Sequence, residues 1–227
     1  MRRIHPDISA PSFRSLFFFE LNGKIGKLFF KHKSNINKKK SETPLFLDIG
    51  AGRHYTDGWV HVDFYKTRIR KFWEKYQGNI PDIETDLRDT LNCDSNIVDG
   101  IYSGHTLEHL FPNHANQLLE ECFRVLKPGA WLRINVPDLG RVIDFYNNKI
   151  ELPHFKYKAE AIGHLTQNHG HCSVWDAELL TNTLKEIGFV DVKEVAFGEE
   201  GTDTRLIKEE AYRKDETLVV EARKPNL

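Results

Sequence analysis

The residue types that could form a nucleoside-binding site lie close to position 50. The apolar run 45–49, interrupted only by Asp48, leads directly into Gly50-Ala51-Gly52. This pattern predicts a buried strand entering a tight turn, where glycines permit positive φ and let a ligand lie against the backbone. The next predicted strand, residues 59–62, is followed by Asp63, which could accept hydrogen bonds from two ribose hydroxyls. Together the two stretches predict a nucleoside site at the carboxyl edge of an α/β sheet.

A later stretch supplies groups that could act on an acceptor at the same edge. Residues 97–103 predict another strand, and Gly104-His105-Thr106 follows it. We therefore expect His105 to face the nucleoside site, with Ser103 and Gly104 small enough to leave room for an acceptor. Histidine suits proton removal from an oxygen acceptor because its ordinary pKa lies near neutrality. The alternative is a histidine that only caps the following helix.

Two further residues are candidates for a catalytic role. His109 lies four residues after His105, on the same face if this stretch is helical, and its neighbour Glu108 could orient a histidine or only stabilise the helix start. Asp138 follows the predicted strand 131–136. It could contact the acceptor or act as the N-cap of the next helix.

The segment 147–173 shows weak periodicity and is rich in histidine, including His164, His169 and His171. Two histidines at a spacing of two can bind a metal ion. A lid loop that uses histidine for hydrogen bonding or acceptor contact is the alternative, and we favour it, so we expect no metal site.

The surrounding pattern alternates strands with helices, which predicts a parallel sheet with helices on both faces. Apolar residues at helical spacing predict helices over residues 66–77, 112–126, 139–146 and 176–187. Further strands are predicted over residues 80–85, 190–197 and 217–222. Only ten residues separate Gly52 from Asp63, so the usual crossover helix there must be very short or absent.

Residues 1–43 differ from the rest of the 227-residue chain. They hold ten basic and three acidic residues, whereas residues 44–227 hold 22 basic and 30 acidic ones. Aromatic residues alternate with lysine and arginine, and Asn22-Gly23 should divide the segment into two short helices. We interpret it as a basic aromatic arm and linker that either lies on an anionic membrane or packs on the domain as a cap.

The net negative charge of residues 44–227 argues against nucleic acid as the main substrate.

The cysteine content and the hydropathy of the chain indicate in which cellular compartment we expect the protein. The three cysteines, Cys93, Cys122 and Cys172, are scattered and predict neither a disulfide framework nor a Cys-x-x-Cys metal site. No apolar run approaches the length of a transmembrane helix. We expect a cytoplasmic protein, peripheral to the inner membrane if the arm binds lipid.

Several motifs follow one another in a recognisable order: Leu-Asp-Ile-Gly-Ala-Gly, Val-His-Val-Asp, Thr-Asp-Leu, Leu107-Glu108-His109-Leu110 and Arg124-Val-Leu-Lys-Pro-Gly129. In this order they resemble the class I S-adenosylmethionine-dependent methyltransferases, and most of all a type 11 branch found among polysaccharide and cell-envelope biosynthesis enzymes. The resemblance covers about residues 44–222. It implies a Rossmann-like seven-stranded sheet with the last strand antiparallel, one domain over residues 44–227, and S-adenosylmethionine as cofactor.

The resemblance also implies a set of cofactor-binding residues: Asp48, Gly50, Ala51 and Gly52 at the methionine end, Asp63 at the ribose, Asp86 with Leu87 at the adenine, and Ser103 after the fourth strand. Arg53 stands where the family often has a third glycine. Arg53 or His54 could therefore contact the methionine carboxylate.

The implied reaction is methyl transfer to an oxygen acceptor, with His105 as the candidate base. Methyltransferases that act on nucleobase or amide nitrogen carry Asn or Asp, two prolines and an aromatic residue after the fourth strand, and this chain has Ser103-Gly104-His105-Thr106 instead. The expected acceptor is a sugar hydroxyl in envelope polysaccharide biosynthesis. Two alternatives stay open: O-methylation of a free small metabolite, and a catalytically silent cofactor-binding or membrane-docking module.

Overall fold

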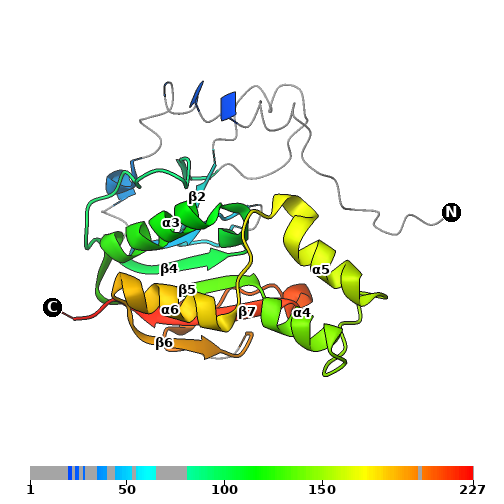
Figure 1. The fold of residues 1–227 in the computed structure, drawn as a ribbon. Coiled ribbons are helices and arrows are strands. Elements are labelled where there is room, and N and C mark those ends of the chain that lie inside the picture. Colours follow the sequence, from blue (N-terminus) through cyan, green and yellow to red (C-terminus); the bar gives the residue numbers. More distant parts are fainter. Residues whose placement is uncertain are drawn as a thin grey trace.

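A seven-stranded sheet forms the centre of the molecule (Figure 1). The computed structural model describes residues 20–21, 24–25, 28, 35–39, 44–52, 55–64, 81–198 and 201–226. The strand order is β3-β2-β1-β4-β5-β7-β6. Neighbours from β3 to β5 pair in parallel, whereas β7 is antiparallel to both β5 and β6. This confirms the predicted α/β sheet with an antiparallel last strand.

The strands lie close to the predicted ranges: β1 Phe46–Ile49, β2 Val60–Asp63, β3 Ile83–Glu84, β4 Val98–Gly104, β5 Leu126–Pro137, β6 Val190–Val195 and β7 Thr217–Arg223. The largest difference is the start of β5, which lies before the predicted strand 131–136. Its pairing with β4 shifts register between Val98 and Gly100. Gly129 adopts a φ of 80° within this irregular stretch, so the Lys-Pro-Gly sequence ends the helix and is also accommodated in the strand.

Helices α3 (Pro112–Val125) and α6 (Ala177–Ile187) lie together over the sheet (Figure 1). Each buries an apolar stripe at helical spacing, with Leu118, Leu119 and Cys122 in α3 and Leu180 and Leu184 in α6. Asp176 is the N-cap of α6, and its side chain accepts from the Leu179 N–H at 2.8 Å. Gly188, with a φ of 114°, is the C-cap. The predicted helix 66–77 lies outside the described residues.

The main core extends into the segment that we interpreted as a linker. Ile36, in the short 3₁₀ helix η1 (Ile36–Lys39), is fully buried in the core that contains β1. Its N–H donates to the Asn92 carbonyl at 2.9 Å. The packed domain therefore begins before residue 44. Most of the rest of the arm, including both predicted short helices over much of their length, lies outside the described residues.

A small helical unit follows β5. Helices α4 (Leu139–Tyr146) and α5 (Lys158–Gln167) pack against each other around a second, smaller apolar cluster. The bounds of α4 confirm the predicted helix 139–146. The prediction of an irregular segment over 147–173 is wrong, because α5 lies within it. Only Ala161 and Leu165 are buried in α5, which is too short a stripe to give a clear periodic signal. Among the described helices, none has the length and apolarity needed to cross a membrane.

The chain between β6 and β7 is held by a buried ion triad. It contains the short 3₁₀ helices η4 (Thr204–Leu206) and η5 (Ala211–Arg213). Arg133, in the middle of β5, is fully buried and pairs with Glu209 of this segment and, at 2.6 Å, with Glu221 of β7. This triad fixes the neighbouring residues, Lys208 and Glu210, over the carboxyl edge of the sheet.

Candidate active site

The glycine turn after β1 is shaped by close contact with the loop after β4. Gly50 has a φ of 75°, and a Cβ atom there would lie 2.0 Å from the Thr106 Oγ1. The Thr106 hydroxyl donates to the Ile49 carbonyl at 3.1 Å, and the Gly50 N–H donates to the Val62 carbonyl at 2.8 Å. A side chain at position 50 would therefore separate the two loops, which explains why only glycine fits.

Asp63 ends β2 and holds the same turn from the other side. Its carboxylate accepts from the Gly52 N–H at 3.1 Å and from the Phe64 N–H at 2.7 Å. The predicted acid and the predicted glycine turn are therefore neighbours in space, as a nucleoside site requires.

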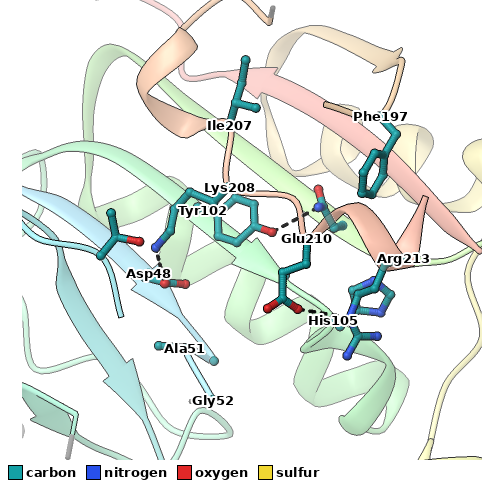
Figure 2. Close-up of a pocket in the computed structure, with 14 residues that line it drawn as sticks. Asp48, Ala51, Gly52, Tyr102, His105, Phe197, Ile207, Lys208, Glu210 and Arg213 are labelled. Atoms are coloured by element: carbon teal, nitrogen blue, oxygen red, sulfur yellow. Dashed lines mark hydrogen bonds and ion pairs between the residues drawn. The ribbon is translucent and has the colours of Figure 1, made fainter. Parts of the chain in front are cut away.

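A cavity of about 340 Å³ opens at this edge of the sheet. The β1 turn contributes Asp48, Gly50, Ala51 and Gly52, and the end of β4 contributes Tyr102, Gly104 and His105. The segment between β6 and β7 contributes Ile207, Lys208, Glu210 and Arg213. Figure 2 shows Asp48 and Lys208 together on one side of the cavity, with His105, Glu210 and Arg213 on the other. A volume of this size is within the range of small-molecule sites.

Asp48 and Lys208 form a buried ion pair on one side of the cavity. Burial raises the pKa of the Asp48 carboxyl, and the Lys208 ammonium opposes this shift. The ammonium also lies 4.3 Å from the ring centroid of Trp59, where a cation is attracted by the face of the ring. A carboxylate and an ammonium group therefore lie side by side with little exposure to solvent.

The rest of the cavity lining has further polar groups. The Arg213 Nε lies 3.6 Å from the Glu210 Oε2. The Tyr102 hydroxyl accepts from the Asn135 side-chain N–H at 3.1 Å, and burial raises the pKa of this tyrosine. Tyr102 therefore stays protonated at neutral pH and is unsuited to act as a base.

His105 lies at the end of β4 in a left-handed backbone conformation, with a φ of 49°. Its N–H donates to the Asn135 carbonyl at 2.9 Å. In the ring, Nε2 lies 2.9 Å from the Thr217 Oγ1, and Nδ1 lies 3.2 Å from the Glu108 Oε1 without hydrogen-bond geometry. A carboxylate next to Nδ1 favours a proton on that nitrogen, which leaves Nε2 with the lone pair.

Four of the predicted cofactor residues, Asp63, Asp86, Leu87 and Ser103, lie outside the cavity lining. The Asp86 carboxylate is buried and accepts from the Arg88 guanidinium at 2.8 and 2.9 Å. Leu87 is buried beside it. Ser103 is buried in β4 between two lining residues, and its hydroxyl has no hydrogen-bond partner among the described residues.

The other catalytic candidates, His109 and Asp138, also lie outside the cavity lining. Asp138 is the N-cap of α4, where its carboxylate accepts from the Gly140 N–H at 2.8 Å, and burial raises its pKa. His109 lies in the 3₁₀ helix η2 (Leu107–His109), and its ring centroid is 5.1 Å from that of His171. The structure therefore brings His109 to the histidine-rich segment.

Sequence reasoning missed the part of the cavity formed between β6 and β7. Lys208, Glu210 and Arg213 belong to a strongly charged stretch with no recognisable motif. A detectable signal was the length of this connection, because 21 residues separate Val195 from Thr217, whereas two antiparallel neighbours need only a short turn. Arg53 and His54, the residues that we expected to contact the methionine carboxylate, lie outside the described residues.

Comparison with known proteins gives one family match. Residues 47–134 match the family model described as a methyltransferase domain, of type 11. The span runs from β1 into β5 and includes the glycine turn and His105. No curated protein sequence matches the chain significantly.

Solved structures show the same fold. A SAM-dependent methyltransferase from Archaeoglobus fulgidus is 20% identical with a TM-score of 0.50, and the match covers 94% of this chain and 100% of that one. A chain in the complex of the Haloferax volcanii Trm112 methyltransferase activator with the putative methyltransferase is 16% identical with a TM-score of 0.50, covering 92% and 98%.

Proposed function

We propose that the chain is a class I S-adenosylmethionine-dependent methyltransferase and that it methylates an oxygen acceptor, a sugar hydroxyl of an envelope polysaccharide or of its nucleotide-linked precursor. The observation that carries this proposal is the position of His105. Its ring lines the same cavity as the glycine turn, with a carboxylate next to one nitrogen and a hydroxyl next to the other. The choice of a sugar acceptor comes from the resemblance to envelope enzymes and not from the geometry of the site.

The ion pair on one side of the cavity fits the amino-acid end of the cofactor. That end carries one ammonium and one carboxylate, and the cavity offers the Asp48 carboxylate and the Lys208 ammonium side by side. Gly50 and Gly52 have positive φ and leave backbone exposed to the ligand. We assign the ribose hydroxyls to Asp63, whose carboxylate accepts from the Gly52 N–H beside the cavity.

The bound cofactor supplies an electrophilic methyl group on a sulfonium, so the leaving group needs no activation by the protein. The main tasks of the chain are then to hold the acceptor in line and to exclude water. A hydroxyl must also lose its proton as it attacks. His105 is the group that we assign to this step, with Nε2 as the atom that takes the proton and Thr217 as its partner before the acceptor binds.

The reaction is tested by incubating the protein with S-adenosylmethionine and a panel of sugars, nucleotide sugars, small phenols and amines. Mass spectrometry should show a gain of one methyl group on a sugar hydroxyl, and the same sugar without that hydroxyl should remain unchanged. Methylation of amines alone, or of a free small metabolite alone, would contradict the proposed sugar acceptor. Tight cofactor binding with no product on any acceptor would instead support a silent binding module.

Asp63→Ala should weaken binding of S-adenosylhomocysteine by about 1.5–3 kcal/mol, because a charged hydrogen-bonding group is lost. Calorimetry measures this directly and needs no acceptor. Asp57→Ala is the matched control, since it removes an exposed acid from the same β1–β2 connection and should leave affinity unchanged. Equal affinities for both variants, or a preference of the protein for NAD, would contradict the assignment.

Lys208→Met should weaken S-adenosylhomocysteine binding roughly 10-fold or more, because the ligand carboxylate loses a charged partner. The same variant should bind 5′-methylthioadenosine as well as the unchanged protein does, since this nucleoside has no amino-acid end. Calorimetry with both ligands separates the two effects. Tighter binding of S-adenosylhomocysteine would mean that Lys208 competes with the ligand for Asp48, and would refute the carboxylate role.

A further inference from the structure

A buried carboxylate that has no hydrogen-bond partner among the described residues lies beside the active site. Glu108 is 2% exposed, and neither of its carboxylate oxygens has a hydrogen-bond partner among the described residues. Burying an unpaired carboxylate is costly, so such a group normally pairs with a cation or coordinates a metal. His105 faces one of its oxygens at 3.2 Å, which leaves the other oxygen to be accounted for.

Two histidines from different segments meet at this carboxylate. His109 follows it directly in η2, and His171 comes from the stretch after η3 (Asn168–Gly170). One ligand atom from each of the three residues lies within 4.8 Å of the other two. His171 Nδ1 lies 2.7 Å from the Leu165 carbonyl, so Nδ1 carries the proton and Nε2 has the lone pair. A histidine fixed in this way by a backbone carbonyl is the usual arrangement of a metal ligand.

We propose that Glu108, His109 and His171 form a binding site for a divalent transition metal, with zinc as the best match. Two imidazoles and one carboxylate are a known zinc ligand set that leaves a fourth position open. Carboxylate and imidazole ligands without a thiolate also suit other first-row metals. This proposal departs from our sequence-based expectation of a hydrogen-bonding lid without metal.

The electrostatics of the cluster agree with this use. Burial lowers the pKa of both His109 and His171, and the Glu108 carboxylate opposes this shift without reversing it. Both rings are therefore neutral at pH 7, the form that binds metal. A divalent cation would also compensate the charge of the buried Glu108 carboxylate.

The site would fasten the α5–η3 segment to the loop after β4. Backbone contacts already join these parts, because the Cys172 and Ser173 N–H groups donate to the Glu108 carbonyl at 2.7 and 3.1 Å. The Ser173 hydroxyl donates to the Leu107 carbonyl at 3.0 Å. A metal would add a stronger link at the point where Glu108 also faces His105. In this proposal the metal holds the histidine-rich segment and the Glu108 carboxylate in place beside the cavity.

The test is metal binding by the full-length protein, which requires no acceptor and no turnover. After dialysis against a chelator, zinc sulfate is added alone, and bound zinc is measured by elemental mass spectrometry together with the melting temperature. We expect about one zinc per chain and a melting temperature several degrees higher in saturating zinc. His109→Ala, His171→Ala and Glu108→Gln should each lower zinc affinity by at least about 10-fold.

Two controls keep the result specific. His154→Ala removes an exposed histidine nearby in sequence, and Cys172→Ser removes the exposed thiol next to His171. Both should keep one tightly bound zinc. Cobalt(II) in place of zinc should give a visible absorption spectrum that His171→Ala abolishes. The proposal is overturned if zinc does not bind in a fixed ratio, or if the three ligand variants, shown to be folded by circular dichroism, bind it like the unchanged protein. Either outcome leaves the methyltransferase proposal untouched.

Discussion

Arg133→Met should lower the free energy of unfolding by about 3–5 kcal/mol, one of the largest stability effects that we expect for a single substitution in this chain. The guanidinium is fully buried between Glu209 and Glu221, which are also buried. Methionine fills much of the same space but leaves two carboxylates without their cation. The penalty is therefore the cost of uncompensated buried charge and exceeds the net value of the ion pairs.

Urea unfolding monitored by circular dichroism measures this change. Lys149→Met is the matched control, because Lys149 pairs with Asp144 on the surface at 2.9 Å and both side chains are exposed. A surface pair of this kind is worth about 0–1 kcal/mol. Arg133→Met should also weaken cofactor binding, because Glu209 precedes Glu210 and follows Lys208 in the segment that lines the cavity. If both variants were equally stable, the triad would not be what holds this segment.

The parts of the fold that were predictable from sequence are those with a local signal. The run 45–49 is apolar because β1 is buried along its whole length. The helix that became α4 was predicted at its observed bounds because its apolar residues repeat at helical spacing. Gly50 was recognisable because it directly follows a predicted strand, where a tight turn requires glycine. Asp63 was recognisable because it ends the next predicted strand, where an acid can bind a ribose.

The other half of the cavity was not predictable, because its contacts join residues far apart in the chain. The partner of Asp48 is Lys208, 160 positions later, and the partner of His105 is Thr217, 112 positions later. Neither pairing leaves a periodic or motif signal. Both depend on β7 inserting between β5 and β6, which brings the preceding charged segment over the glycine turn. The meeting of Glu108 and His109 with His171 has the same origin in tertiary packing.

The contact between Thr217 and His105 distinguishes a structural role of His105 from a catalytic one. Thr217 begins β7 and is almost fully buried, and its hydroxyl lies 2.9 Å from the Nε2 of His105. If His105 only stabilises the contact between β4 and β7, it keeps its hydrogen bond to Thr217 throughout. A base would exchange the Thr217 hydroxyl for the acceptor hydroxyl when substrate binds. The two roles predict different results for the two residues.

His105→Asn should lower kcat by roughly 10²–10⁴-fold, the usual contribution of a placed general base. Asparagine is the substitution of choice because it tolerates the positive φ at this position better than alanine. It keeps a small polar side chain but has no atom that can take up the proton. Affinity for S-adenosylhomocysteine should stay within a few fold, because His105 acts on the acceptor rather than on the cofactor.

Thr217→Val is the control that separates catalysis from packing. It removes the same hydrogen bond from the other side and leaves the imidazole in place, so its melting temperature should fall about as much as that of His105→Asn while kcat falls far less. The measurements are kcat with the methyl acceptor found in the mass-gain screen, cofactor affinity by calorimetry, and thermal unfolding. Equal losses of stability with nearly normal kcat in both variants would show that His105 only joins β4 to β7, and the assignment of the base would then be wrong.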